Sequence, residues 1–299
     1  MDESATATIT LAGEITYFTG EGEEGRYFVF LKKTKNLPFS PPPVAFRDPI
    51  AVRQRMMFNR GRRWSVPVDK SPSRIAGMFD SIAPRYDLLN HVLSAGLDTR
   101  WRDTAVDALA LAPKARVLDL CTGTADLAIA TVTRATEATV VGVDFAGEML
   151  RLGLAKVRRG GFERTIRLVR GDAARIPLAD ASCDGATIAF GIRNVAEPER
   201  ALAELARVLR PGGRLAILEF GQPRIPGIRT AYAWYFRYLL PLVGRMVSKH
   251  QSAYAYLPAS VGTFPSAAEF SQMIAAADFS QVRAVPLTLG IVYLYTAQR

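Results

Sequence analysis

Cysteine and histidine, the side chains most used for redox and metal chemistry, are scarce in this sequence of 299 residues. The two cysteines are Cys121 and Cys183, and the two histidines are His91 and His250. Residues this few and this widely spaced make neither a disulfide framework nor a cluster of metal ligands. We therefore expect no metal site and a reducing cytoplasmic environment, with both cysteines as small buried residues.

The sequence also lacks an apolar run long enough to cross a bilayer, which takes about eighteen or more residues. The most apolar late segment, residues 231–247, is interrupted by Arg237, Pro241 and Arg245. The N-terminus has acidic residues early and no basic region followed by an apolar core, so it does not resemble a signal peptide. We expect no transmembrane helix, and 49% hydrophobic residues suffice for a sizeable core.

Acidic residues are fewer than basic ones: the sequence has 28 Asp and Glu against 38 Lys and Arg, which gives a formal net charge of +10. Much of the excess lies in residues 47–74. A solvated basic linker is the favoured interpretation, and contact with anionic lipid or with nucleic acid is the alternative. No nucleic-acid motif supports the last of these, so we expect no nucleic-acid partner.

Residues 1–70 show no sustained periodicity. They contain a Gly/Glu-rich patch at 20–25, a short β-like run at 26–31, a proline cluster at 38–43 and then the basic stretch. We interpret residues 1–70 as a partly disordered extension, and residues 71–299 as the functional domain.

From residue 71 onward, short apolar runs alternate with segments of helical spacing, which predicts a parallel α/β sheet. Strands are expected at 117–120, 139–143, 166–169, 186–190 and 215–219, with a closing antiparallel pair at 282–287 and 292–295. Helices are expected at 75–82, where Pro84 should interrupt, and at 101–111, 126–132, 148–158, 198–209, 228–250 and 267–277.

The turn after the first of these strands is the strongest functional signal. Gly123 follows the strand, and Asp144 ends the next one about twenty residues later, a spacing at which a carboxylate can hold ribose hydroxyls. The turn lacks the further glycines that would admit a pyrophosphate, and Asp119 and Asp126 flank it with negative charge. These carboxylates favour S-adenosylmethionine, which carries an ammonium and a sulfonium, although the turn alone leaves an ordinary strand-to-helix connection open.

Longer motifs resemble a known family. The strand ends at Asp119, Asp144 and Asp172 are similar to those of class I S-adenosylmethionine-dependent methyltransferases. Residues 86–94 with Trp101, and residues 207–219, resemble the two signatures of the ubiquinone/menaquinone biosynthesis C-methyltransferase family, and residues 190–195 and 253–261 are also similar to it. The resemblance covers residues 71–299. It implies a Rossmann-like fold with a seven-stranded, mostly parallel sheet, helices on both faces and an antiparallel C-terminal strand pair.

The resemblance also implies an activity, the C-methylation of a reduced quinone with S-adenosylmethionine. The turn at Cys121–Ala125 is more similar to that of menaquinone-specific members, which favours demethylmenaquinol as the substrate. The alternatives are a polyprenyl methoxybenzoquinol of ubiquinone synthesis, a nicotinamide dehydrogenase, which the missing glycines disfavour, and a non-enzymatic adenosine-binding protein. Because the substrate is polyprenylated, transient contact of the protein with the inner face of the plasma membrane is one alternative that the sequence does not exclude. Self-association is another.

The expected cofactor-binding residues follow the strand ends. Asp119 should lie under the methionine portion, Gly123 and Thr124 should allow close backbone approach, and Asp144 should bind the ribose diol. Asp172 should accept from the adenine amino group while the Ala173 N–H donates to the ring.

The expected catalytic residues are Arg193, Asn194 and His91. Arg193 should stabilise a phenolate, since a guanidinium stays protonated and is a poor base. His91, His250 and Asp87 compete for the role of proton acceptor, which the sequence leaves unassigned. An aromatic segment beginning at Tyr232 is either core or a lining for the substrate.

Overall fold

The structure, a computed structural model, describes residues 7–11, 15–22, 26–33, 44–46, 70–223, 225–234, 256 and 260–299. The chain divides into two compact units, Met1–Trp64 and Ser65–Arg299. Within the first unit, four strands form an antiparallel sheet in the order β1-β2-β3-β4. They are β1 (Ala7–Leu11), β2 (Ile15–Gly22), β3 (Arg26–Lys33) and β4 (Val44–Phe46). Only β3 was indicated by the sequence.

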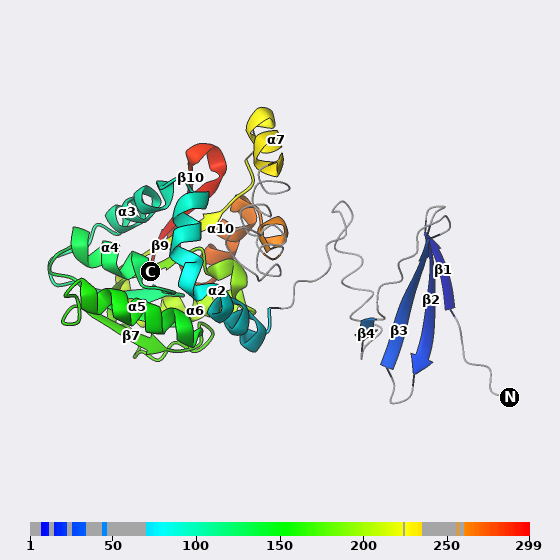
Figure 1. The fold of residues 1–299 in the computed structure, drawn as a ribbon, viewed down its shortest axis with the longest axis horizontal. Coiled ribbons are helices and arrows are strands. Elements are labelled where there is room, and N and C mark those ends of the chain that lie inside the picture. The colour runs from blue at the N-terminus through cyan, green and yellow to red at the C-terminus, as the bar shows by residue number, and fades with distance from the viewer. Residues whose placement is uncertain are drawn as a thin grey trace. The chain divides into compact units, whose positions relative to one another are not determined.

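The second unit is built on a seven-stranded sheet in the order β10-β11-β9-β8-β5-β6-β7 (Figure 1). Its strands are β5 (Arg116–Leu120), β6 (Thr139–Asp144), β7 (Ile166–Arg170), β8 (Cys183–Ala189), β9 (Leu209–Phe220), β10 (Ser280–Leu287) and β11 (Val292–Gln298). Strands β5 to β9 pair in parallel, whereas β11 pairs antiparallel with both β9 and β10. The expected mostly parallel sheet with an antiparallel C-terminal pair is confirmed.

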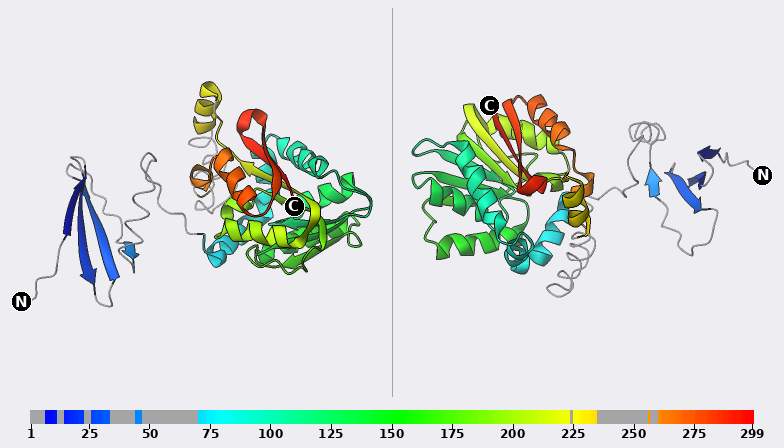
Figure 2. Two further views of the ribbon diagram at one scale, coloured as in Figure 1. Left: turned by 180° about the vertical axis from the view of Figure 1, so that it is seen from behind. Right: turned by 90° about the horizontal axis from the view of Figure 1, so that it is seen from above.

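Helices cover both faces of this sheet, as Figure 2 shows from two further sides. They are α2 (Pro72–Leu93), α3 (Leu97–Leu109), α4 (Asp126–Arg134), α5 (Gly147–Arg159), α6 (Pro198–Val208), α7 (Pro226–Trp234) and α10 (Ala267–Ala276). One buried cluster joins α3, α4 and α5 to the sheet through Trp101, Val132 and Val157, and the other joins α6 and α10 through Leu202 and Phe270. Neighbouring side chains of one strand point into opposite clusters, so the central strands are buried on both faces. Burial on both faces explains why these strands are apolar runs in the sequence.

Helix α2 differs from its prediction, because it continues through Pro84 instead of ending there. A proline removes one hydrogen bond from the helix interior. Packing compensates for that loss: Ala76 and Ala83 of α2 are buried against Ala146 and Met149 at the start of α5. The favourable proline in this helix is Pro72, which stands in its first turn, where the missing N–H has no helical partner anyway.

Strand β9 also starts earlier than expected. The sequence placed a turn at residues 210–213 before the strand, but β9 begins at Leu209, which pairs with Cys183 of β8. The next pair is Gly185 with Arg214, so the extra residues on the β9 side are accommodated as an irregularity. Gly212 makes this local bend feasible with a φ of 83°.

Candidate functional site

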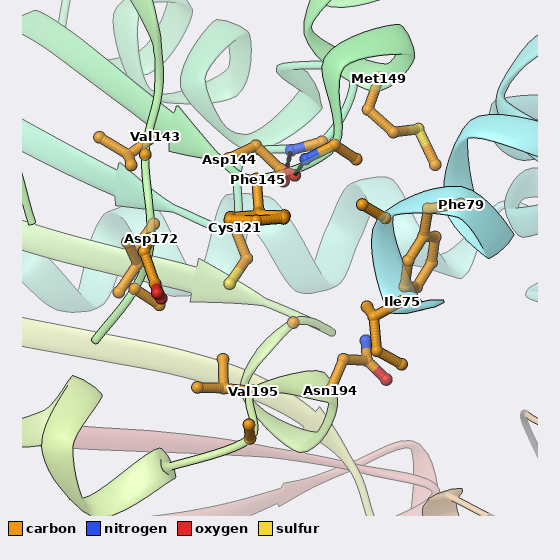
Figure 3. Close-up of a pocket in the computed structure, with 18 of the residues that line it drawn as sticks. Ile75, Phe79, Cys121, Val143, Asp144, Phe145, Met149, Asp172, Asn194 and Val195 are labelled. Carbon is orange, nitrogen blue, oxygen red and sulfur yellow. Dashed lines mark hydrogen bonds between the residues drawn. The ribbon is translucent and has the colours of Figure 1, made fainter. Parts of the chain in front are cut away.

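A cavity lies at the carboxyl ends of the parallel strands, where open α/β sheets collect ligands. The volume of the cavity is about 920 Å³, which includes the part that opens to solvent. Its walls come from the end of each of β5, β6, β7 and β8, from the 3-10 turn η1 (Ile192–Asn194) and from the start of α2. In Figure 3, Asp172 lies on one side of the cavity, and Ile75 and Phe79 of α2 lie on the other.

The turn after β5 has an unusual backbone. Cys121, Gly123 and Ala125 all have positive φ, at 56°, 56° and 68°. Positive φ is uncommon for residues with a side chain and is concentrated at functional sites. A Cβ built on Gly123 would meet nothing within 4 Å, so its glycine leaves the backbone open toward the cavity. A Cβ on Gly191, by contrast, would lie 2.3 Å from that of Cys121, so this close crossing requires glycine.

Asp144 fastens this turn to the end of β6. Its Oδ2 accepts a hydrogen bond from the Gly123 N–H, and its Oδ1 accepts one from the Ala146 N–H, each at 2.8 Å (Figure 3). Burial raises the pKa of Asp144, and the backbone hydrogen bonds act in the opposite direction. A carboxylate has about four acceptor positions, more than the backbone N–H groups around Asp144 fill, so it can still accept from a hydroxyl donor in the cavity.

Asp172 and Ala173 line the same cavity from the end of β7. The Oδ1 atom of Asp172 accepts from the Ala174 N–H at 2.9 Å, which leaves Oδ2 available. Thus five of the predicted residues line this one cavity: Gly123, Asp144, Asp172, Ala173 and Asn194.

Asp119 and Thr124 are close to the turn but do not line the cavity. Asp119 is 1% exposed, and its carboxylate accepts from the hydroxyls of Thr122 at 2.5 Å and Thr187 at 2.9 Å. Burial raises the pKa of Asp119 to about 6. The Thr124 hydroxyl donates to Asp87 at 2.5 Å and accepts from Lys156 at 3.0 Å, so it links the turn to α2 and α5.

Arg193 is buried beside the cavity but is not part of its lining. Its Nη1 donates to Oε1 of the buried Glu219 at 2.7 Å and to the Phe190 carbonyl, and its guanidinium stacks on Phe220 at 5.2 Å. The Nε atom is buried and has no hydrogen-bond partner among the described residues. The neighbouring Asn194 does line the cavity, and its Oδ1 accepts from the Tyr256 hydroxyl at 3.0 Å.

His91 is placed away from the cavity, near the end of α2. Its side chain is 61% exposed, and Nδ1 lies 3.3 Å from Oδ1 of the buried Asp98. Burial alone would raise the pKa of Asp98, but the hydrogen bond and charge of Arg102 outweigh it and hold that pKa below its usual value. The other histidine, His250, lies outside the described residues.

The sequence did not indicate that α2 and the residue Lys70 before it contribute to the cavity. Lys70, Ile75, Ala76, Phe79 and Tyr86 line the cavity, although none of them follows a strand. The amphipathic spacing of Ile75 and Phe79 was a visible signal of a helix, but nothing in it said that the helix covers the strand ends.

The two cysteines have different surroundings. The expectation of two buried cysteines is confirmed for Cys183, which is 3% exposed. It is wrong for Cys121, which is half-buried because the strand ends there and its side chain lines the cavity.

Within the described residues, no group of three or more His, Cys, Asp and Glu could hold a metal ion. In the same part of the chain, no helix is long and apolar enough to cross a membrane. The aromatic segment expected at 228–250 is described only as far as the end of α7, and residues 235–250 lie outside the described part.

The sheet order, the helices on both faces and the cavity at the strand ends define the class I methyltransferase fold. A solved structure with this fold is a SAM-dependent methyltransferase of Thermotoga maritima, described as a possible histamine N-methyltransferase. It aligns with a TM-score of 0.52 at 18% identity, over 75% of this chain and 99% of that one.

The chain belongs to the ubiE/COQ5 methyltransferase family, whose model matches residues 68–299. A relative named demethylmenaquinone methyltransferase, from Thermus thermophilus, is 49% identical over 223 residues, which are 74% of this chain and all of that protein. Another, the ubiquinone/menaquinone biosynthesis C-methyltransferase UbiE of Geotalea daltonii, is 45% identical over 76% of this chain and 96% of its own length. These matches confirm the resemblance inferred from the motifs.

Proposed function

We propose that this protein transfers a methyl group from S-adenosylmethionine to a ring carbon of demethylmenaquinol. The proposal rests on the hydrogen bond between Asp144 and the Gly123 N–H in the lining of the cavity. The turn that contains Gly123 lacks the further glycines that would bind a pyrophosphate. Membership of the ubiE/COQ5 methyltransferase family supports the reaction class. The name of the Thermus thermophilus relative supports the substrate.

The residues present fit S-adenosylmethionine. The free lone pairs of Asp144 suit ribose hydroxyls, and Oδ2 of Asp172 suits the adenine amino group. The Phe145 ring, 38% exposed, gives the adenine an apolar surface in the same cavity. The open side of Gly123 leaves room for the methionine portion. When bound, this compound supplies an electrophilic methyl group on a sulfonium.

The opposite side of the cavity suits an aromatic quinol. Ile75, Ala76 and Phe79 of α2 form an apolar wall, and Asn194 places an amide at its edge. Holding the reacting carbon in line with the methyl group and excluding water is what such a wall contributes to methyl transfer. We propose that Arg193 stabilises negative charge on the quinol oxygen through its own positive charge, since it is buried beside the cavity, next to Asn194, without contacting the interior of the cavity.

Calorimetry with S-adenosylmethionine and with NAD tests the cofactor assignment. We expect binding of the first and none of the second. Asp144→Ala should weaken S-adenosylmethionine binding by about 1.5 to 3 kcal/mol, the range for losing a charged hydrogen-bond acceptor. Asp107→Ala is the matched control, since Asp107 is exposed on α3 and pairs only with Arg134 within the described residues. Tight NAD binding without an S-adenosylmethionine signal would refute the proposal.

We also propose that the enzyme meets its polyprenylated substrate at a membrane surface. Exposed apolar side chains include Leu88 and Val92 late in α2, and Leu289 in the turn η3 (Thr288–Gly290). The turn η3 precedes β11 where that strand pairs with the end of β9. Sedimentation with anionic vesicles should carry the protein down, and Leu88→Gln with Val92→Gln should weaken this at unchanged S-adenosylmethionine affinity. Equal sedimentation of the double variant would contradict this part of the proposal.

A further inference from the structure

Lys70 brings an amine into the cavity from the segment just before α2. It is one of the lining residues and is half-buried. It makes no hydrogen bond or ion pair with any other residue that the structure describes. It lines the same cavity as Ile75 and Phe79, the α2 residues of the apolar wall that we propose for the quinol. The amine therefore lies in the cavity in which the quinol is proposed to bind.

The charges around Lys70 come from three elements. Arg193 of η1, Glu219 of β9 and Glu199 of α6 all act on it. Burial lowers the pKa of Lys70 and the positive charge of Arg193 lowers it further, whereas Glu219 and Glu199 act in the opposite direction with less effect. Part of the Glu219 charge is taken up by its ion pair with Arg193. Lys70 therefore releases its proton more readily than an exposed lysine does.

The other titratable groups of the cavity are poorer proton acceptors for a quinol. Burial raises the pKa of the Tyr86 hydroxyl and of the Cys121 thiol, so both stay protonated near neutral pH. Asp144 is held by backbone N–H groups, and its remaining acceptor capacity is assigned to the ribose. Asp172 and Glu197 are carboxylates, which are weaker bases than an amine.

We propose that Nζ of Lys70, as the neutral amine, accepts the hydroxyl proton of the quinol bound in this cavity. The inference rests on the proposed function and assigns the proton acceptor that the sequence left open. With the proton on Nζ, the phenolate pushes electrons to the adjacent ring carbon, which forms a C–C bond to the methyl group. The C–S bond breaks, and its electron pair stays on sulfur.

The remaining atoms balance without a further reactant. The methylated ring carbon still carries its hydrogen. Loss of that proton and return of one proton to the oxygen restore the aromatic quinol. The proton held by Lys70 passes to solvent, so the net products are the methylated quinol, the neutral thioether and one proton. The substrate is neither oxidised nor reduced.

Three variants of the full-length protein test this role. Lys70→Met should lower kcat by about 10² to 10⁴, the usual contribution of a positioned acid or base, with S-adenosylmethionine affinity unchanged. Lys70→Arg keeps the positive charge but cannot accept a proton, so it should be as slow as Lys70→Met. Arg158→Met is the matched control, because it removes one exposed positive charge on α5, away from the cavity, and should behave as wild type.

Two further measurements distinguish a lysine that accepts the proton from a lysine with only a structural role. The wild-type kcat/KM should rise with pH until Lys70 is neutral and then level off, and Lys70→Met should lack that rise. Methylamine added to Lys70→Met should restore part of the turnover. Full turnover of Lys70→Arg would show that charge alone suffices, and full turnover of Lys70→Met would remove Lys70 from the reaction.

A binding measurement keeps this inference separate from the proposed function. With S-adenosylhomocysteine present, 1-naphthol should bind to the wild type partly as the naphtholate, detected by its absorbance, and to Lys70→Met as the neutral naphthol. Equal ionisation in both proteins would overturn the Lys70 assignment even if the quinol is methylated. A wild type that ionises naphthol but leaves demethylmenaquinol unmethylated would refute the proposed substrate and retain the role of Lys70.

Discussion

Asp119 is predicted to lie under the methionine portion of S-adenosylmethionine, and in the structure its carboxylate contacts side chains of the fold. Its carboxylate is held between two threonine hydroxyls beneath the cavity floor, with 1% exposure. The folded protein favours the protonated form, since burial raises the pKa from 3.8 to about 6. A group whose pKa is raised by folding gives most stability below its unfolded pKa, and that stability is lost as the pH rises through the folded pKa.

Asp119→Asn should therefore change how stability depends on pH. Between about pH 4 and pH 7, the free energy of unfolding of the wild type should fall relative to the variant by up to about 3 kcal/mol. Asparagine keeps both hydrogen bonds, because a threonine hydroxyl can donate or accept. Urea unfolding at several pH values, without S-adenosylmethionine, measures the difference. Parallel pH profiles for the two proteins would contradict this explanation.

Helix α2 forms one wall of the cavity, and polar contacts fix its position. Asp87 of α2 accepts from Thr124 at 2.5 Å and pairs with Lys156 of α5 at 2.7 Å. Asp80 of α2 accepts from the Glu148 N–H in the first turn of α5 at 2.9 Å. The turn after β5, α5 and α2 are thus held together around the site.

Asp87→Ala should loosen α2 without unfolding the domain. Losing a hydrogen bond and an ion pair that are partly exposed should cost about 1 to 2 kcal/mol, so amide exchange in residues 72–93 should accelerate about tenfold. Hydrogen exchange read by mass spectrometry measures this segment directly. Asp107→Ala, which breaks an exposed pair with Arg134, should leave α2 exchange unchanged. Equal acceleration in both variants would mean that Asp87 has no special role.

The sequence predicted elements whose signal is local. Apolar β-prone runs and helical spacing located all seven strands of the main sheet. The spacing of Gly123 and Asp144 indicated two residues that line the cavity, and their role in binding stays a prediction. The sequence could not predict α2 across Pro84, because the compensating packing on Met149 comes from a helix about sixty residues later in the chain. For the same reason Lys70 was assigned to the extension: its place in the cavity depends on where α2 lies, not on its neighbours in sequence.

The chain divides into the units Met1–Trp64 and Ser65–Arg299, whereas the sequence predicts that the functional domain begins at residue 71. A protein beginning at Ser65 should fold and retain both S-adenosylmethionine binding and turnover, since both buried clusters of the main sheet lie after that point. A protein beginning at Ser71 should keep the binding but lose turnover with Lys70. Circular dichroism, calorimetry and the methylation assay compare the two. An insoluble Ser65 protein would show that the first unit is part of the domain.

Turnover with an isotope-labelled methyl donor measures methyl transfer to a reduced quinone ring. The full-length protein is incubated with S-adenosylmethionine carrying a ¹³C methyl group and with demethylmenaquinone, either reduced by dithionite or left oxidised, and the lipids are analysed by mass spectrometry. We predict labelled menaquinone from the reduced substrate alone, because only the quinol can become a phenolate whose ring carbon attacks the sulfonium methyl. Labelling of the oxidised quinone at the same rate would rule out attack by a phenolate, and no label in the quinone from either sample would refute methyl transfer to this substrate.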